Sequence, residues 1–215
     1  MGLRVNEIFH SIQGESSHAG WPCVFIRLTG CNLRCRYCDT RYAYEEGEVM
    51  AIPDILQEVA AFGCPLVEVT GGEPLLQQES PALIEQLLDR GYDVLLETNG
   101  SRNIAGIDRR CIKIVDVKCP SSGEAASNDL DNMTRLESHD EIKCVLADRE
   151  DYLFARAIYQ RIFQGSQRRN VVHFSPVFGQ LEARDLAQWI LEDRLGVRLN
   201  LQLHKFIWNP DQRGV

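Results

Sequence analysis

The sequence lacks three features that would place the protein at a membrane, outside the cell or on nucleic acid. It has no apolar run of about 18 residues, the length that a membrane-spanning helix needs. Its first residues, MGLRVNEIFHSIQGE, contain no apolar signal core and have the pattern of a strand. Basic residues are scarce, because 23 Lys and Arg stand against 31 Asp and Glu, for a formal net charge of −8. A broad nucleic-acid footprint needs a basic surface, so we expect a cytoplasmic protein that binds neither membrane nor nucleic acid directly.

Size and composition predict one globular domain. The chain has 215 residues, of which 44% are hydrophobic and 25% are charged, as in ordinary soluble domains. We found no internal repeat and no linker that would divide it. Eight cysteines in a chain of cytosolic character favour metal binding over disulfides.

Three of these cysteines form one short run. Cys31, Cys35 and Cys38 are spaced C-x3-C-x2-C within GCNLRCRYCDT. Four cysteines would complete the ligands of a tetrahedral zinc or of a four-iron cluster, whereas three leave one coordination position open for chemistry. Two simpler interpretations remain, a zinc knuckle whose fourth ligand lies elsewhere and three unrelated buried thiols.

Strand and helix patterns alternate along the chain. Strands are expected at 24–28, 66–70, 92–97, 112–117, 141–146, 171–174 and 197–203, and helices at 52–62, 81–90, 150–163 and 183–195. About six β/α repeats predict a parallel sheet with outer helices, fewer than the eight of a full barrel. We therefore expect an open, partial (β/α)6-type barrel. Residues 1–22 would form an N-terminal strand extension on the substrate side, 23–203 the core, and 204–215 a tail over the site.

The residues with chemical potential follow the predicted strands. The cysteine loop, TGGEP, ETNG, DVKCP and FSPVFG each come where a strand ends, and loops at the carboxyl ends of parallel strands form the active sites of such folds. Gly71 and Gly72 would let the backbone approach a ligand closely, although a tight β/α turn explains them equally well. This convergence of loops indicates an enzyme.

The cysteine run with its aromatic residue, C-x3-C-x-Tyr37-C, resembles the signature of radical S-adenosylmethionine (SAM) enzymes. In that superfamily a partial barrel holds a [4Fe-4S] cluster, SAM binds the open iron, and one electron cleaves SAM to a 5′-deoxyadenosyl radical. The resemblance implies that the three cysteines bind the cluster. It also implies a set of SAM contacts, namely Tyr37, Cys38, Asp39, Gly72, Glu73, Lys118, Cys119, Ser175 and Pro176.

A narrower resemblance covers nearly the whole chain. The segment EIFHSIQGES, followed by FIRLTGCNLRCRYCDT, VTGGEPLLQ, LETNG and QLHK, is similar to the 7-carboxy-7-deazaguanine synthase family. That family rearranges 6-carboxy-5,6,7,8-tetrahydropterin to 7-carboxy-7-deazaguanine with loss of ammonia, a radical carbon–nitrogen lyase reaction in 7-deazapurine and queuosine biosynthesis. One departure is Ser16, where relatives often have glycine.

This resemblance also suggests how the substrate is bound. Arginine grips carboxylates through two hydrogen bonds, so Arg27 would hold the substrate carboxylate. Carboxylates accept the N–H donors of the amino-pyrimidinone edge. The implied substrate contacts are Ile12, Gln13, Gly14, Glu15, Arg27, Thr70, Glu97 and His204. Thr40 would contribute to a Mg²⁺ ion that also meets the substrate carboxylate. The tail would close over the substrate, and the sequence does not distinguish Pro210 from Val215 as the residue that contacts it.

Two other functions would use the same cysteines. An activase that makes a glycyl radical on a partner protein would leave the N-terminal element unexplained. An iron–sulfur or zinc module without catalysis would give a protein without SAM chemistry. The resemblance further implies a homodimer and a reductant such as flavodoxin or ferredoxin.

Overall fold

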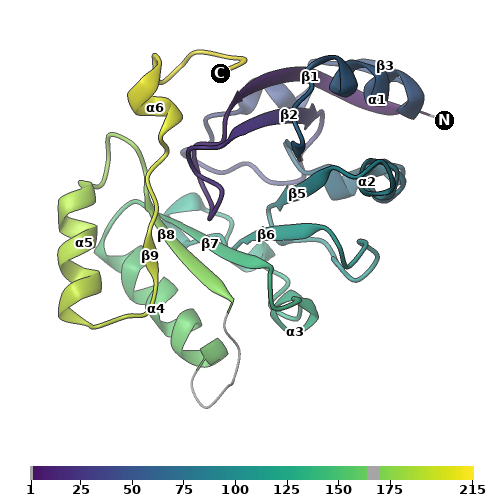
Figure 1. Ribbon diagram of the computed structural model, residues 1–215. Helices are drawn as coiled ribbons and strands as arrows, with labels where there is room; N and C mark the ends of the chain where they lie inside the picture. Colours follow the sequence, from purple (N-terminus) through teal and green to yellow (C-terminus); the bar gives the residue numbers. More distant parts are fainter. Residues whose placement is uncertain (1, 164–169) are drawn as a thin grey trace.

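The computed structural model describes residues 2–163 and 170–215. Residue 1 of the predicted N-terminal extension and residues 164–169 of the predicted core lie outside the described residues. The described strands form one sheet in the order β3-β1-β2-β4-β5-β6-β7-β8-β9. Their bounds are Leu3–Ile12 (β1), Pro22–Leu28 (β2), Glu48–Met50 (β3), Leu66–Gly71 (β4), Asp93–Thr98 (β5), Ile112–Asp116 (β6), Glu141–Leu146 (β7), Val171–Pro176 (β8) and Arg198–Leu199 (β9). The sheet curves but does not close (Figure 1).

Helices cover the outside of this sheet, except the last one, which lies in the tail beside the cavity (Figure 1). They are Ile52–Ala61 (α1), Ser80–Asp89 (α2), Asn132–Arg135 (α3), Arg149–Phe163 (α4), Ala183–Glu192 (α5) and His204–Ile207 (α6), with short 3-10 turns between them. Leu56 and Val59 on α1 and Leu83 and Leu87 on α2 are buried, so each helix packs its apolar stripe on the sheet. None of the described helices has the length and apolar character needed to cross a bilayer.

The predicted partial barrel is confirmed. From β2 to β8, six strands pair in parallel, and β1 is added antiparallel to β2, with Phe9 opposite Phe25. The short edge strand β3, which the sequence did not suggest, pairs with β1. The N-terminal extension is therefore part of the same sheet.

The last predicted strand was wrong in length. A strand was expected over 197–203, but β9 covers only Arg198–Leu199. After β9, the Asn200 amide still donates to the Phe174 carbonyl on β8, and the Asn200 side chain donates to Ser175. The chain then turns away from the sheet, and the Leu203 amide donates to the Gly14 carbonyl at 2.9 Å. The tail thus joins the N-terminal segment.

The two faces of the central strands differ in polarity. Val24, Ile26 and Leu28 on β2 are fully buried against the helices. The alternate residues Phe25 and Arg27 face the inside of the barrel and pair in register with Glu68 and Thr70 on β4. The inner face therefore carries charged and polar side chains on several strands, which is where a small molecule can be bound.

Candidate active site

A cavity of about 480 Å³ opens inside the barrel, at the carboxyl ends of the strands. It is bordered by the cysteine loop, by the inner residues of β2 and β4 to β7, and by the tail. Its size is in the range of ligand-binding cavities. The large majority of the predicted site residues line it, namely Ile12, Gln13, Gly14, Glu15, Arg27, Cys31, Cys35, Tyr37, Cys38, Asp39, Thr40, Thr70, Gly72, Glu97, Lys118 and His204.

The three cysteines border the cavity as free, half-buried thiols. Cys31 Sγ accepts hydrogen bonds from the Leu33 amide at 3.4 Å and from the Asn99 carboxamide at 3.8 Å, and burial raises the pKa of Cys31. Among the described residues no three His, Cys, Asp or Glu side chains converge as ligands of a single metal ion would. Soft thiolate donors with N–H···S bonds fit an iron–sulfur cluster, in which each cysteine binds a different iron.

The glycine pair after β4 packs directly on the cysteine loop. A Cβ atom on Gly72 would lie 2.2 Å from the Gly30 carbonyl oxygen and 2.8 Å from Cys31 Cβ. The Glu73 amide donates to the same Gly30 carbonyl at 2.7 Å. Only glycine allows this approach, so the TGGEP turn fixes the position of the cysteine loop as well as lining the cavity.

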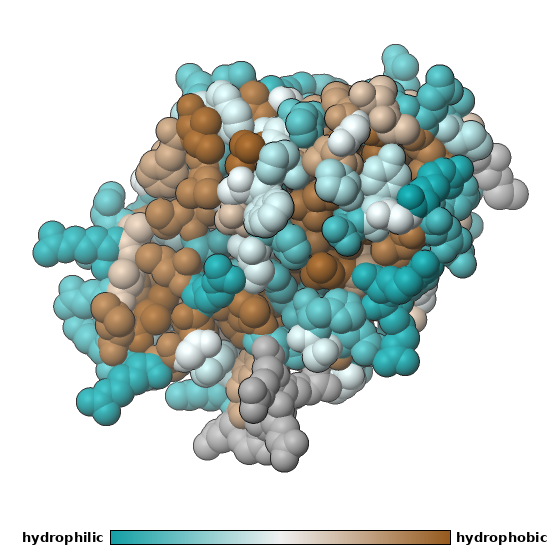
Figure 2. Space-filling view, in the orientation of Figure 1, coloured by the Kyte–Doolittle hydropathy of each residue, from teal (hydrophilic) through white to brown (hydrophobic). Residues whose placement is uncertain are grey.

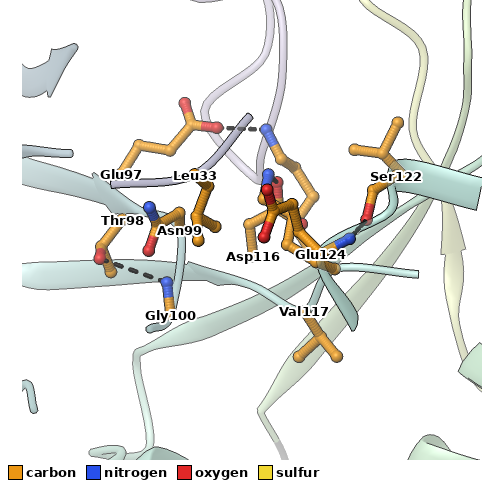
Figure 3. A network of polar contacts seen from close by, with 12 residues as sticks. Leu33, Glu97, Thr98, Asn99, Gly100, Asp116, Val117, Ser122 and Glu124 are labelled. Carbon is orange, nitrogen blue, oxygen red and sulfur yellow. Dashed lines mark hydrogen bonds and ion pairs between the residues drawn. The ribbon is translucent and has the colours of Figure 1, made fainter. Parts of the chain in front are cut away.

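Glu73 does not reach the cavity. It is fully buried and accepts hydrogen bonds from the Leu75 amide at 2.9 Å, the Thr98 hydroxyl at 2.9 Å and the Asn99 amide at 2.7 Å. Figure 3 shows Thr98 and Asn99 beside Glu97 at the end of β5. Glu73 therefore positions the neighbouring loops from behind.

Three further predicted SAM contacts also lie behind the cavity wall. Cys119 is fully buried, and its thiol donates to the Val117 carbonyl. Ser175 bonds the Asn200 side chain within the sheet, and Pro176 ends β8. By contrast, Lys118 lines the cavity and its ammonium donates to Asp116 at 2.6 Å. Burial alone would lower the pKa of Lys118, but the Asp116 carboxylate raises it, so the lysine stays charged.

A buried cation that the sequence did not single out lies at the centre of the site. The Lys143 ammonium, on β7, donates to Glu15 at 2.7 Å and to Glu97. Gln202 donates to the other Glu15 oxygen at 2.7 Å. Burial opposes the ionisation of Glu15, and Lys143 nevertheless holds its pKa below the usual value. Lys143 thus holds in place Glu15 and Glu97, the two carboxylates that are predicted to contact the substrate.

Arg27 is held in place before any ligand binds. Its Nε donates to Glu7 at 2.7 Å, and its guanidinium lies 5.6 Å from the Phe9 ring centre and 5.8 Å from that of Tyr42. Tyr42 also donates to Glu7, at 2.9 Å. Arg27 also lines the cavity, where its guanidinium can meet an anion.

On another side of the cavity, Asp39, Thr40 and the tail come together. The Thr40 hydroxyl donates to Asp39 at 3.0 Å, and Lys205 donates to the second Asp39 oxygen at 2.6 Å. Burial opposes ionisation of Asp39, but Lys205 lowers its pKa below the usual range. Pro210 and Val215 both line the cavity, so the tail covers the site. The tail returns from α6 toward β1 (Figure 1).

The N-terminal segment meets the tail closely. A Cβ atom on Gly14 would lie 2.4 Å from His204 Nδ1, so glycine is needed for this contact. Ser16 adopts φ 62°, the left-handed region, which accounts for glycine at this position in relatives. The Ser16 hydroxyl accepts from the His18 amide at 3.1 Å, which compensates part of the strain of a non-glycine residue.

Comparison with known proteins agrees with this geometry. Residues 25–120 match the model of the Radical SAM superfamily. The chain is 51% identical to 7-carboxy-7-deazaguanine synthase from Chlorobaculum tepidum, over 99% of this chain and 97% of the relative. It is 46% identical to the synthase of that name from Koribacter versatilis, over 99% and 100%.

A solved structure shares the fold. The crystal structure of QueE from Escherichia coli superposes with a TM-score of 0.79 at 22% identity, covering 94% of both chains. The fold, the cysteine-lined cavity and the full-length similarity lead to one assignment. This chain is a member of the 7-carboxy-7-deazaguanine synthase family within the radical SAM superfamily.

Proposed function

We propose that this chain converts 6-carboxy-5,6,7,8-tetrahydropterin to 7-carboxy-7-deazaguanine and ammonia. Substrate and products balance in every atom, so the rearrangement consumes no net oxidant. The observation that carries this proposal is that one cavity combines three free cysteines with Arg27 and a pair of carboxylates, Glu15 and Glu97. These are the groups that a carboxylated pterin and a radical cofactor require.

The cysteines would hold a [4Fe-4S] cluster through its three protein-bound irons. The reduced cluster would supply the electron that cleaves bound SAM, and SAM would supply the 5′-deoxyadenosyl radical that takes up and returns one hydrogen atom. The chain itself orients the reactants, with Tyr37, Gly72 and Lys118 on the wall nearest the thiols. Glu73, Cys119, Ser175 and Pro176 would act on SAM through the loops they support, because they do not line the cavity.

Arg27 is proposed to hold the substrate carboxylate through a bidentate contact, since its Nε is occupied by Glu7 and its terminal nitrogens have no hydrogen-bond partner among the described residues. Glu15 and Glu97 would accept the N–H groups of the amino-pyrimidinone edge. Backbone groups of Ile12, Gln13 and Gly14 and the side chains of Thr70 and His204 would complete the contacts, and all of them line the cavity.

Thr40 is proposed to take part in a Mg²⁺ site with the substrate carboxylate. Its hydroxyl lies beside the Asp39 carboxylate, and both border the cavity. Mg²⁺ keeps several waters and binds through few protein oxygens and those of a substrate, which fits such a sparse site. Titration of Mg²⁺ into wild type and Thr40→Val, with substrate affinity as the readout, tests it.

The product assay decides the function. Protein reconstituted without air should form 7-carboxy-7-deazaguanine from the carboxytetrahydropterin, SAM and a reductant, as detected by mass spectrometry. A Cys35→Ala variant that keeps its fold should bind less iron and form no product. Iron and SAM cleavage without that product would reject the substrate. Radical formation on a partner protein would instead favour the activase, which the full-length similarity does not.

The assembly and the partners complete the proposal. A flavodoxin or ferredoxin would supply the electron, and the chain would act in the cytoplasm as a single domain of 1–215. Apolar side chains stay exposed on α5, β9 and α6, including Leu191, Leu199, Phe206 and Ile207, and Figure 2 shows hydrophobic residues gathered toward that side. This supports a homodimer, which sedimentation at several protein concentrations tests.

A further inference from the structure

One carboxyl group in the cavity wall has no role in the site described so far. Glu68 lies in the middle of β4, on its inner face, two residues before Thr70. Only 2% of it is exposed, although it borders the cavity. A buried carboxyl on an otherwise apolar strand is costly, so its contacts must compensate for its burial.

The first contact ties Glu68 to the N-terminal segment. The carboxamide of Gln13, which is 3% exposed, donates to Glu68. The other end of the same carboxamide accepts from the Glu15 amide at 2.6 Å. Glu68, Gln13 and Glu15 therefore form a continuous chain of hydrogen bonds from the barrel wall to a substrate-binding segment.

The second contact concerns charge. Three carboxyl groups, Glu15, Glu68 and Glu97, face one ammonium, that of Lys143. Lys143 donates to Glu15 and Glu97 but not to Glu68. Glu68 instead interacts with the Glu97 carboxyl group, and two carboxyl groups can share a hydrogen bond only if one of them carries a proton.

The surroundings place this proton on Glu68. Burial raises the pKa of Glu68 well above its usual value, and the Glu97 charge raises it further. The groups that face it from the packed elements are Cys23 on β2, Glu97 on β5, Lys143 on β7 and Glu15. Lys143 lowers the pKa of Glu68, but it is engaged by two other carboxylates. Cys23 is itself held neutral by burial.

We propose that Glu68 is a neutral carboxylic acid that positions Gln13 and Glu97 for the amino-pyrimidinone edge of the substrate. Its hydroxyl donates to Glu97, whose remaining lone pairs are left for substrate N–H groups, and its oxygen accepts from Gln13. Glu68 is thus a positioning residue for substrate specificity. This inference rests on the proposed function, because it takes the pterin as the ligand of Glu97.

Three variants test the role against wild type. Glu68→Gln keeps one donor and one acceptor, so its KM for the carboxytetrahydropterin should stay within about threefold of wild type. Glu68→Ala removes the acceptor of the Gln13 carboxamide nitrogen and the carboxyl group beside Glu97, and KM should rise by at least about tenfold, as expected for a lost buried hydrogen-bond partner. Glu58→Gln, on the exposed face of α1, is the matched control and should leave the KM for the carboxytetrahydropterin unchanged. SAM affinity should be the same in all four proteins.

The charge state has its own readout, which needs no activity. The infrared spectrum of the folded wild type should contain the carbonyl stretch of a protonated carboxyl group at neutral pH, and Glu68→Gln should lack it. Because Glu68 ionises as the pH rises, any weakening of substrate binding at alkaline pH should be smaller in Glu68→Gln than in wild type.

Each contrary result has a clear meaning. Glu68→Gln as impaired as Glu68→Ala would show that a charged carboxylate is required. An unchanged Glu68→Ala would remove the positioning role, and an infrared band retained in Glu68→Gln would place the proton elsewhere. If wild type makes no product while the band behaves as expected, the proposed function fails and the neutral state of Glu68 stands.

Discussion

Replacing Lys143 with methionine tests the central ion cluster most directly. The lysine side chain is 6% exposed, and those of its partners Glu15 and Glu97 are 14% and 28% exposed. Methionine fills most of the volume but leaves two buried carboxylates without a cation. Removing one partner of a buried ion pair costs about 3–5 kcal/mol. Since water reaches Glu97, we expect the lower end, about 3 kcal/mol of unfolding free energy.

That loss corresponds to a lower melting temperature by about 6–12 °C for a chain of this length. Thermal unfolding of the anaerobically reconstituted protein, followed by circular dichroism, measures it. Arg110→Met is the matched control, because this arginine pairs with Asp89 and Asp108 on the surface. Exposed ion pairs add little stability, so the control should melt almost as wild type does.

The pH dependence gives the prediction its sign. In wild type, Lys143 holds the pKa of Glu15 below its usual value, so the stability from this pair is present above that value and is lost in acid. Without the lysine, burial raises the pKa of the Glu15 carboxyl group, and the variant regains stability as the pH falls and this group becomes protonated. The deficit should therefore be larger at pH 8 than at pH 5. Equal deficits, or one no larger than that of Arg110→Met, would refute this account of the cluster.

Three further variants address the rest of the site. Arg27→Ala should raise the substrate KM by about tenfold or more, since it removes the proposed bidentate contact, and should leave the SAM affinity measured in titrations unchanged. An equal loss of affinity for substrate and SAM would contradict the role of Arg27 in holding the substrate carboxylate. Deleting residues 211–215 removes Arg213, whose guanidinium lies 3.8 Å from the Tyr42 ring centre. This deletion should raise the substrate KM several-fold. Unchanged kinetics would show that these residues take no part in substrate binding. Glu73→Ala should lower the unfolding free energy by about 3 kcal/mol in urea titrations, because three donors lose their acceptor. A loss of SAM affinity without a loss of stability would instead show that Glu73 contacts SAM directly.

The sequence was sufficient for the order of the elements and for the cluster loop. Apolar strands and amphipathic helices alternate with a clear change of period, and the bounds agree to within a residue or two over most of the barrel. The cysteine spacing needs no tertiary information, because all three proposed cluster ligands lie within eight residues. The end of the sheet could not be predicted, since 197–203 keeps an alternating pattern while its partners beyond β9 are in the N-terminal segment.

The buried charges are harder to predict. Glu68 is the one charged residue of β4, and Lys143 lies two residues after Glu141 in β7, and in both strands alternation would place such charges in solvent. In a barrel, alternate residues of each strand face the enclosed interior, which here contains the candidate site. The alternating pattern that would expose a residue on an open sheet therefore buries it here. Glu15 and Glu97 were found through the family resemblance, whereas the lysine that fixes both lies on β7, far from either in sequence.

The contacts between the two chain ends explain how six parallel strands can enclose a site that eight form in a full barrel. The Leu203 amide bonds the Gly14 carbonyl, and Gln202 bonds Glu15, so the tail is held by the segment that follows β1. Beyond it, Arg213 pairs with Glu46 and stacks on Tyr42. The open side is therefore covered by the chain termini rather than by further β/α units. Because these termini also carry the proposed substrate contacts, we expect their closure and substrate binding to stabilise each other, as thermodynamic linkage requires.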